Sequence, residues 1–129
     1  MKIKYLEELE VVLANNKISK EEVCIVGSAV MTLHGLRENN DIDIILKDTV
    51  RNKIFPLKTT KLSKNIELVS FHWLHSNKKI TDNEIIENKL YHTRYCGYKF
   101  VSLTLLEERK NNSQKQKDKK DLSLIRGAL

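Results

Sequence analysis

Two short groups of polar residues could together handle a phosphorylated ligand. Gly27 and Ser28 follow an apolar run, and Asp41 and Asp43 come after an intervening segment of twelve residues, 29–40. A glycine at the end of a strand lets the backbone approach a ligand closely, and the serine adds a hydroxyl group. Aspartates at alternate positions of a strand project from one face and can ligate Mg²⁺, which keeps waters and substrate phosphates as its other ligands. The pattern predicts a phosphate site beside a metal site.

Three further residues are candidates for the same site, each with a second interpretation that the sequence leaves open. Glu67 could complete a two-metal site or act as a general base, or it could face outward from a half-exposed strand. Arg37 could bind a triphosphate or be an exposed loop arginine. Lys117 belongs to a basic run, 109–121, that could reach nucleotide phosphates or form a solvated helix face.

Three short segments have the composition of strands that would position these residues. Residues 23–26 are wholly apolar and are followed by a glycine, which is typical of a strand buried on both faces. Residues 41–46 alternate before they become apolar, and residues 66–71 indicate a third strand that contains Glu67. Between the first two strands, residues 29–34 indicate a short helix that ends at a glycine.

The rest of the chain is predicted to supply helices and one hairpin. Apolar residues at helical spacing predict an amphipathic helix over about 3–15, and a capping-box pattern at 81–84 begins a helix that runs to about Lys89. Further expected elements are a hairpin of 91–95 with 98–102 around Cys96-Gly97, a helix over 103–110, and a helix over 115–129 with Asp118 facing inward. These elements predict an α/β protein, more narrowly α+β, with a small mixed sheet and helices mainly on one side.

The segment that contains Gly27, Ser28, Asp41 and Asp43 resembles the signature of the DNA polymerase β-like nucleotidyltransferase superfamily. That signature is an apolar residue, Gly, Gly or Ser, a spacer of this length, then Asp, an apolar residue, Asp or Glu, and an apolar residue, and the chain matches all of it. Residues 27–43 are similar to the small bacterial branch that includes lincosamide nucleotidyltransferases and toxin–antitoxin-associated transferases. Residues 117–122 resemble the Lys-Asp-x-x-Asp-apolar segment often found at the end of such domains.

The resemblance implies a nucleotidyltransferase fold and a Mg²⁺-dependent activity. A nucleoside monophosphate would pass from an NTP to a hydroxyl or phosphate acceptor, a small molecule or a sugar, with release of pyrophosphate. The residues that match the family's functional positions are Gly27 and Ser28 for the nucleotide, and Asp41 and Asp43, with Glu67 as the third carboxylate, for catalysis and two Mg²⁺ ions. Arg37 and Lys117 are further nucleotide-binding candidates because of their charge.

The chain also departs from this family. Val30 and Met31 stand where the minimal antitoxin transferases usually carry an arginine, and the extra helical or substrate domain of larger members is not expected. The acceptor would then be recognised by the middle of the chain, by a homodimer partner or by another protein. The alternative function is an antitoxin-type or regulatory module of the same fold that binds or modifies a partner protein.

Length and composition limit the class of protein. With 129 residues, 40% of them hydrophobic, we expect one domain over residues 1–129. The net charge of +6 favours phosphate-rich partners, but no aromatic residues interleave with the basic run near the C-terminus, which argues against nucleic acid. No apolar stretch approaches the ~18–20 residues that span a bilayer, and no signal peptide is recognisable, so we expect a cytoplasmic protein.

The cysteines and histidines suggest no second chemistry. Two cysteines, Cys24 and Cys96, are too few for a disulfide framework, and a disulfide between them is not expected. His72 and His75 could be combined with His92 and Cys96 into a zinc site, but the second spaced ligand pair typical of such sites is missing.

Overall fold

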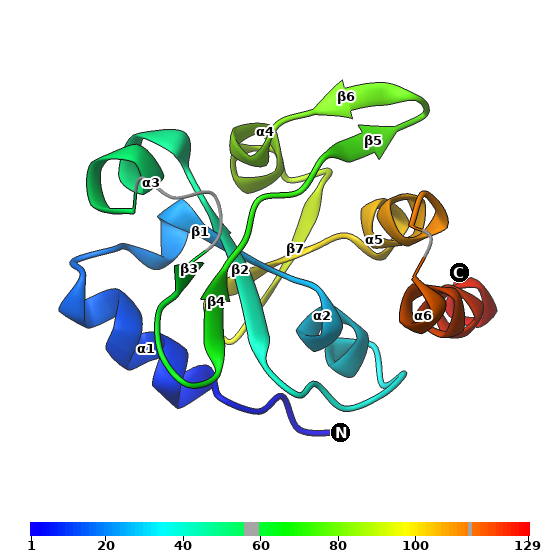
Figure 1. Cartoon of the computed structure of the whole chain (residues 1–129), viewed down its shortest axis with the longest axis horizontal. Coiled ribbons are helices and arrows are strands. Elements are labelled where there is room, and N and C mark those ends of the chain that lie inside the picture. The colour runs from blue at the N-terminus through cyan, green and yellow to red at the C-terminus, as the bar shows by residue number, and fades with distance from the viewer. Residues whose placement is uncertain (56–59, 114) are drawn as a thin grey trace.

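The computed structural model describes residues 1–55, 60–113 and 115–129. Over these residues the chain forms a six-stranded mixed sheet, a two-stranded sheet and helices packed around them (Figure 1). The predicted α+β class with a mixed sheet is therefore confirmed. Within these ranges, no helix combines the length and the apolar character needed to cross a bilayer.

The large sheet has the strand order β3-β4-β2-β1-β8-β7. Its strands are β1 (Val23–Val26), β2 (Ile42–Leu46), β3 (Thr60–Lys61), β4 (Ile66–Leu68), β7 (His92–Tyr95) and β8 (Tyr98–Val101). In its centre, β1 pairs antiparallel with β2 and parallel with β8, and β2 pairs parallel with β4. The outer strands β3 and β7 run antiparallel to their neighbours. A separate hairpin consists of β5 (Trp73–His75) and β6 (Lys78–Ile80).

The helices are distributed along the whole chain. They are α1 (Leu6–Asn15), the 3₁₀ helix η1 (Lys20–Glu22), α2 (Ser28–Leu33), α3 (Asp48–Ile54), α4 (Asp82–Glu87), α5 (Leu103–Asn111) and α6 (Gln116–Ala128). Figure 1 shows α5 and α6 side by side, and these two helices contact each other. Both lie next to α2, which is far from them in the sequence.

The core is centred on β1 and β8, in which every residue is buried. Successive side chains of a strand point to opposite faces, so both faces of the sheet are covered here. The buried Lys99 of β8 is accommodated because its Nζ donates to the carbonyl oxygens of Glu21 (2.9 Å) and Ile86 (2.8 Å). These bonds satisfy an ammonium group that would otherwise be costly to bury.

Local turn and cap chemistry agrees with the sequence in several places. The predicted capping box is present at α4, where the Thr81 hydroxyl accepts from the Glu84 N–H and the Glu84 carboxylate accepts from the Thr81 N–H. The β7–β8 hairpin turns at Cys96 and Gly97, whose φ angles of 52° and 80° match a two-residue turn with both central residues left-handed. The hairpin and the helix start are therefore confirmed.

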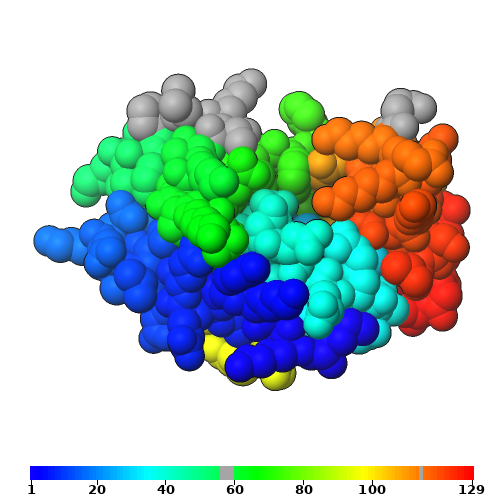
Figure 2. Space-filling model, turned by 60° about the horizontal axis from the view of Figure 1, so that its bottom comes forward, coloured from blue at the N-terminus to red at the C-terminus, as the bar shows by residue number. Residues whose placement is uncertain are grey.

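Other predicted boundaries are wrong by a few residues. The first helix begins at Leu6, because Tyr5 has a φ of 73°, which no helical residue adopts. The residues before it are not helical, and the Asn39 side chain bonds the backbone N–H and C=O of Lys4 (both 3.1 Å). In Figure 2 these N-terminal residues (dark blue) lie across one face beside the segment that follows α2 (cyan). The strand predicted over 66–71 ends at Leu68.

Candidate functional site

Gly27 is required by the geometry between β1 and α2. Its φ of 73° and ψ of −145° belong to a region that L-residues rarely adopt. A Cβ atom at this position would stand 2.9 Å from Oδ2 of Asp43, closer than real contacts allow. The glycine is therefore needed for a close approach to Asp43, one of the predicted metal ligands. The predicted approach of Gly27 to a phosphate stays a prediction.

The three candidate carboxylates lie on neighbouring strands. In the register of the sheet, Val26 is opposite Asp43, and Asp43 is opposite Glu67. Asp41 comes just before β2, two residues from Asp43, and is exposed, whereas Asp43 and Glu67 are half-buried. All three line one cleft of about 380 Å³ together with Gly27.

The environment of Asp43 disfavours its charged form. Burial, then the negative charges of Asp41 and Glu67, raise the pKa of the Asp43 carboxyl to about 6, and the more distant Lys117 and Lys110 lower it only in part. Its Oδ1 atom is buried and accepts no hydrogen bond from any described residue. A buried acceptor with two like-charged neighbours is an arrangement that a bound cation would stabilise.

The carboxylates do not form a closed metal cage. Among the residues that the structure describes, no three His, Cys, Asp or Glu side chains are grouped closely enough to hold a metal ion by themselves. Mg²⁺ does not need such a cage, because it is commonly bound by one or two carboxylates and completes its shell with water and substrate phosphates. The donor set, oxygen atoms of two or three carboxylates open to a cleft, suits this mode of binding.

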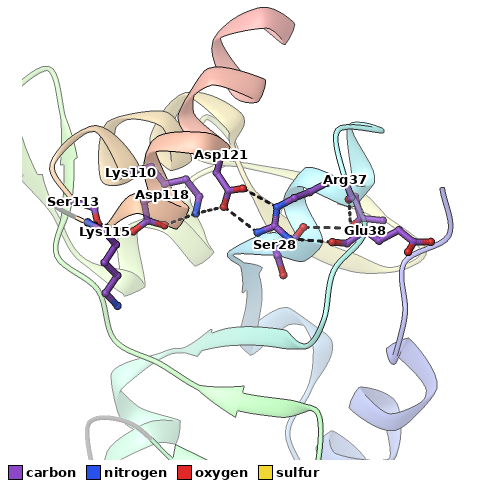
Figure 3. Close-up of polar contacts among 9 residues, drawn as sticks. Ser28, Arg37, Glu38, Lys110, Ser113, Lys115, Asp118 and Asp121 are labelled. Atoms are coloured by element: carbon purple, nitrogen blue, oxygen red, sulfur yellow. Dashed lines mark hydrogen bonds and ion pairs between the residues drawn. The ribbon is translucent and has the colours of Figure 1, made fainter.

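The opposite wall of the cleft is built by residues of α5, of α6 and of the segment after α2, and some of its charged side chains pair with one another. Arg37 donates from Nε and Nη2 to the two carboxylate oxygens of Asp121 at 2.7 and 2.9 Å. Lys110 donates to Asp118 and to Asp121, both at 2.9 Å (Figure 3). We call Arg37, Lys110, Asp118 and Asp121 the helix-side network. It holds α6 to α5 and to the segment after α2.

The pKa values of both aspartates reflect this pairing. Burial alone would raise them, but for Asp121 the hydrogen bonds from Arg37 and Lys110 hold the pKa of the carboxyl below its ordinary value. For Asp118 the hydrogen bonds from Ser113 and Lys110 have the same effect on the pKa. Figure 3 shows Ser28 below this network, at the start of α2. The inward orientation predicted for Asp118 is confirmed, since it is bonded within the helix pair, while Asp121 is the more deeply buried of the two.

The sequence-predicted residues are thus brought together, with one change of role. The residues named from the sequence, Gly27, Ser28, Arg37, Asp41, Asp43, Glu67 and Lys117, all line the same cleft. Arg37, however, directs its guanidinium to Asp121 and to the Glu38 carbonyl (3.0 Å) in this structure. Lys117 is exposed and makes no ion pair with a described residue.

Sequence reasoning missed other residues of the cleft. Phe71, Arg109, Lys110 and Lys115 also line it. Arg109 and Lys110 are part of the basic run that was recognised, but their individual contacts depend on how α5 packs, for which the sequence has no signal. Phe71 was predicted to lie in a strand, whereas it stands in the connection between β4 and β5.

The other groups of polar residues serve structure. His92 is buried with its Nδ1 2.7 Å from the Ile85 carbonyl oxygen, and the ring of His75 packs against Tyr91. Both cysteines are free, with Cys24 buried and Cys96 exposed at the hairpin turn. A second groove of about 760 Å³ lies along the N-terminal residues and is lined by Met1–Glu8, Leu33, Tyr95 and Cys96. It contains none of the residues singled out from the sequence as a site except the exposed Cys96.

Comparison of the chain with models of protein families, with curated proteins and with solved structures finds no match.

Proposed function

We propose that the protein is a divalent-metal-dependent nucleotidyltransferase that moves a nucleoside monophosphate from an NTP to a hydroxyl or phosphate acceptor. One observation carries the proposal: Gly27 approaches Asp43 too closely for any side chain, at a cleft where Asp43 is register-paired with Glu67 and keeps a buried, unbonded oxygen. The same residues form the motif that resembles the DNA polymerase β-like superfamily. A stand-alone structural role would give Asp43 a donor or a counter-charge.

The phosphate end of the NTP is assigned to the Gly27 side of the cleft. The absence of a side chain at Gly27 lets phosphate oxygens approach the backbone, and the Ser28 hydroxyl is available as a further donor. The exposed ammonium groups of Lys115 and Lys117 line the opposite wall and carry charge that can offset that of the triphosphate.

Asp41 and Asp43 would hold one or two Mg²⁺ ions, and Glu67, opposite Asp43 on the next strand, is assigned the role of the base. A bound divalent cation supplies neutralisation of charge on the phosphates and a lower pKa for the attacking oxygen. The chain's own part is to fix the carboxylates on two adjacent strands, where sheet hydrogen bonds maintain their separation. Asp43 must be deprotonated to bind a cation, and with its pKa raised to about 6 half of the metal-free protein is deprotonated at that pH.

In the proposed reaction, residues of the cleft receive both the leaving group and the proton. The acceptor oxygen forms a bond to the α-phosphorus, and the bond from that phosphorus to the oxygen bridging the α- and β-phosphates breaks. Pyrophosphate leaves towards Gly27 and Ser28. The proton of the acceptor hydroxyl passes to the Glu67 carboxylate, which is half-buried on β4 and faces the same cleft.

The test is a titration of the full chain with each of the four NTPs, with and without Mg²⁺. We expect one NTP to bind in a Mg²⁺-dependent manner. The double variant Asp41→Asn/Asp43→Asn should weaken this binding roughly 100-fold, which corresponds to about 2.7 kcal/mol. Asp48→Asn is the matched control, because Asp48 is an exposed aspartate on α3 outside the cleft.

Two outcomes would contradict the proposal. If no NTP binds in the presence of Mg²⁺ or Mn²⁺, the motif does not mark a nucleotide site in this chain, and the alternative of a module that binds a partner protein should be pursued. If an NTP binds but the double variant binds it as well as the Asp48→Asn control does, the assignment of the site to these carboxylates is wrong.

A further inference from the structure

Arg109 is a cation of the cleft that has no role in the proposed function. It lies on α5, is half-buried, and its guanidinium carbon stands 3.7 Å from the centre of the Phe71 ring. It makes no hydrogen bond and no ion pair with any residue of the described ranges. Its helix neighbours differ, since Glu107 pairs with Arg126 at 3.7 Å, Glu108 accepts from the Ser76 N–H at 3.3 Å, and Lys110 bonds two aspartates.

The stack on Phe71 leaves the donors of Arg109 available. A guanidinium group is planar, and its five N–H donors point outward in that plane. Stacking over an aromatic ring occupies one face of the plane and none of the donors. A half-buried guanidinium with unused donors has lost part of its hydration, and the negative charges of Asp118 and Asp43 offset this only in part, so acceptors from a ligand would be favourable. Phosphate is the natural match, because it accepts two parallel hydrogen bonds from such a fork.

The position of the pair indicates which substrate it faces. Gly27 adjoins Asp43 at the end of β1, and Glu67 is opposite Asp43 on β4. From Glu67 the chain continues through Val69, whose N–H still bonds the Ile44 carbonyl at 2.9 Å, to Phe71. Glu67, Val69 and Phe71 all line the cleft. Phe71 and Arg109 therefore lie beyond Glu67, in the direction in which β4 runs away from the level of Gly27.

We propose that Arg109, oriented by Phe71, binds a phosphate group of the acceptor, so that the acceptor of this enzyme is a phosphorylated molecule. The inference rests on the proposed function. It assigns the Gly27 side of the cleft to the triphosphate and the Arg109 side to the molecule whose oxygen attacks, with Glu67 between them to take the proton. Phe71 is a positioning residue in this arrangement, and Arg109 is a substrate-binding residue.

The test is a titration of the full chain with phenyl phosphate, in which the shifts of backbone amide NMR signals report binding. The protein is first saturated with Mg²⁺ and with a non-hydrolysable analogue of the NTP that binds best. We expect Arg109→Gln to weaken phenyl phosphate binding by about tenfold or more, while the affinity for the NTP analogue changes by less than about twofold. Arg126→Gln removes the same charge from an exposed position on α6 and should leave both affinities unchanged.

Two further variants separate binding from general charge and from folding. Arg109→Lys keeps the charge without the planar fork and should restore only part of the affinity for phenyl phosphate. Phe71→Leu keeps an apolar side chain but removes the ring. It should weaken the binding of phenyl phosphate severalfold although the charge of Arg109 is unchanged. Both are expected to fold, because neither removes a hydrogen bond between described residues, and their amide spectra verify this.

The results distinguish this inference from the proposed function. If the NTP analogue does not bind, the proposed function fails, and phenyl phosphate titration of the nucleotide-free protein still tests Arg109. If Arg109→Gln weakens the NTP analogue instead of phenyl phosphate, Arg109 serves the nucleotide and the inference is overturned. It is also overturned if Arg109→Lys equals the wild type, or if phenyl phosphate binds the wild type and Arg109→Gln equally.

Discussion

The two walls of the cleft contain the same kinds of charged residue in opposite states. On the sheet side, burial and then the negative charges of Asp41 and Glu67 raise the pKa of Asp43 to about 6, and no described residue donates a hydrogen bond to its Oδ1. On the helix side, Asp121 is bonded by both Arg37 and Lys110, and its pKa is lowered although it is more deeply buried. Burial opposes ionisation at both positions, so the difference comes from the neighbours.

The two walls of the cleft differ in what their charged side chains do. The helix-side network uses its charges on one another and contributes to the attachment of α6. The sheet side leaves charges unsatisfied in the free protein, which costs stability and is a common property of sites that bind ligands. The two walls should therefore respond in opposite ways when a charge is removed.

The largest expected effect is the loss of stability in Asp121→Asn. The substitution keeps the shape but removes the carboxylate partner of Arg37 and one of the two partners of Lys110, which leaves the network with one uncompensated positive charge. We expect the free energy of unfolding to fall by about 3 kcal/mol, as is typical when one partner of a buried ion pair is removed. Urea unfolding of the metal-free protein measures this.

Asp118→Asn is the matched comparison for that prediction. Asp118 has a side chain that is 14% exposed, against 4% for Asp121, and one cationic partner in the network instead of two. The free energy of unfolding should therefore fall less in Asp118→Asn than in Asp121→Asn. Equal stability of wild type and Asp121→Asn would show that the helix-side network is not an important contributor to folding.

A second prediction compares two glycines with nearly the same φ angle. Gly27 (φ 73°) and Gly35 (φ 71°) both disfavour a side chain, but a Cβ meets Asp43 at Gly27 and nothing within 4 Å at Gly35. Gly35→Ala should cost about 1 kcal/mol from backbone strain alone, and Gly27→Ala about 2 kcal/mol or more. Thermal unfolding at one pH measures both. A smaller cost at Gly27 than at Gly35 would contradict the close approach to Asp43.

The third prediction has the opposite sign. Asp43→Asn removes a charge that the fold disfavours, and its amide can donate to a neighbouring carboxylate. We expect the metal-free variant to be more stable than the wild type by about 1 to 2 kcal/mol at pH 7, while Mg²⁺-dependent NTP binding is lost. Urea unfolding and NTP titration of the same sample measure the two effects. A destabilised variant would mean that Asp43 is a structural residue.

The sequence predicts the sheet side of the cleft well because its signals are local. The bounds of β1 agree with the prediction at both ends, and β2 begins one residue later than predicted. Gly27 is recognisable because it follows an apolar strand, and Asp43 because it belongs to an alternating pair of aspartates a short distance along the chain. The capping box at Thr81 and the turn at Cys96 are likewise recognisable from adjacent residues.

The helix side depends on contacts between distant residues and was not predictable in the same way. The bond from Arg37 to Asp121 joins positions 84 apart in the sequence, and the sequence alone allowed Arg37 to be a phosphate ligand. Helix α3 was missed because its one buried residue is Arg51, which no hydrophobic pattern reveals. The β5–β6 hairpin was missed although Ser76 and Asn77 both have positive φ, since neither is glycine.

The last prediction separates the two walls by pH. The ordinary pKa of an aspartate is 3.8, and that of Asp43 in the fold is about 6. Between these values the folded protein holds a proton that the unfolded chain has released, so the cost of Asp43 is absent below pH 4 and complete above pH 6. The stability gained by Asp43→Asn should therefore shrink to zero as the pH falls from 7 to 4.

The pKa of Asp121 is instead lowered by the fold, so the contribution of Asp121 to stability is complete above the ordinary pKa of an aspartate and is lost only at a lower pH. The deficit of Asp121→Asn should thus stay constant over the same range. Urea unfolding of the three proteins at half-unit steps of pH measures both differences, and parallel curves for wild type and Asp43→Asn would contradict the raised pKa on which the contrast between the walls depends.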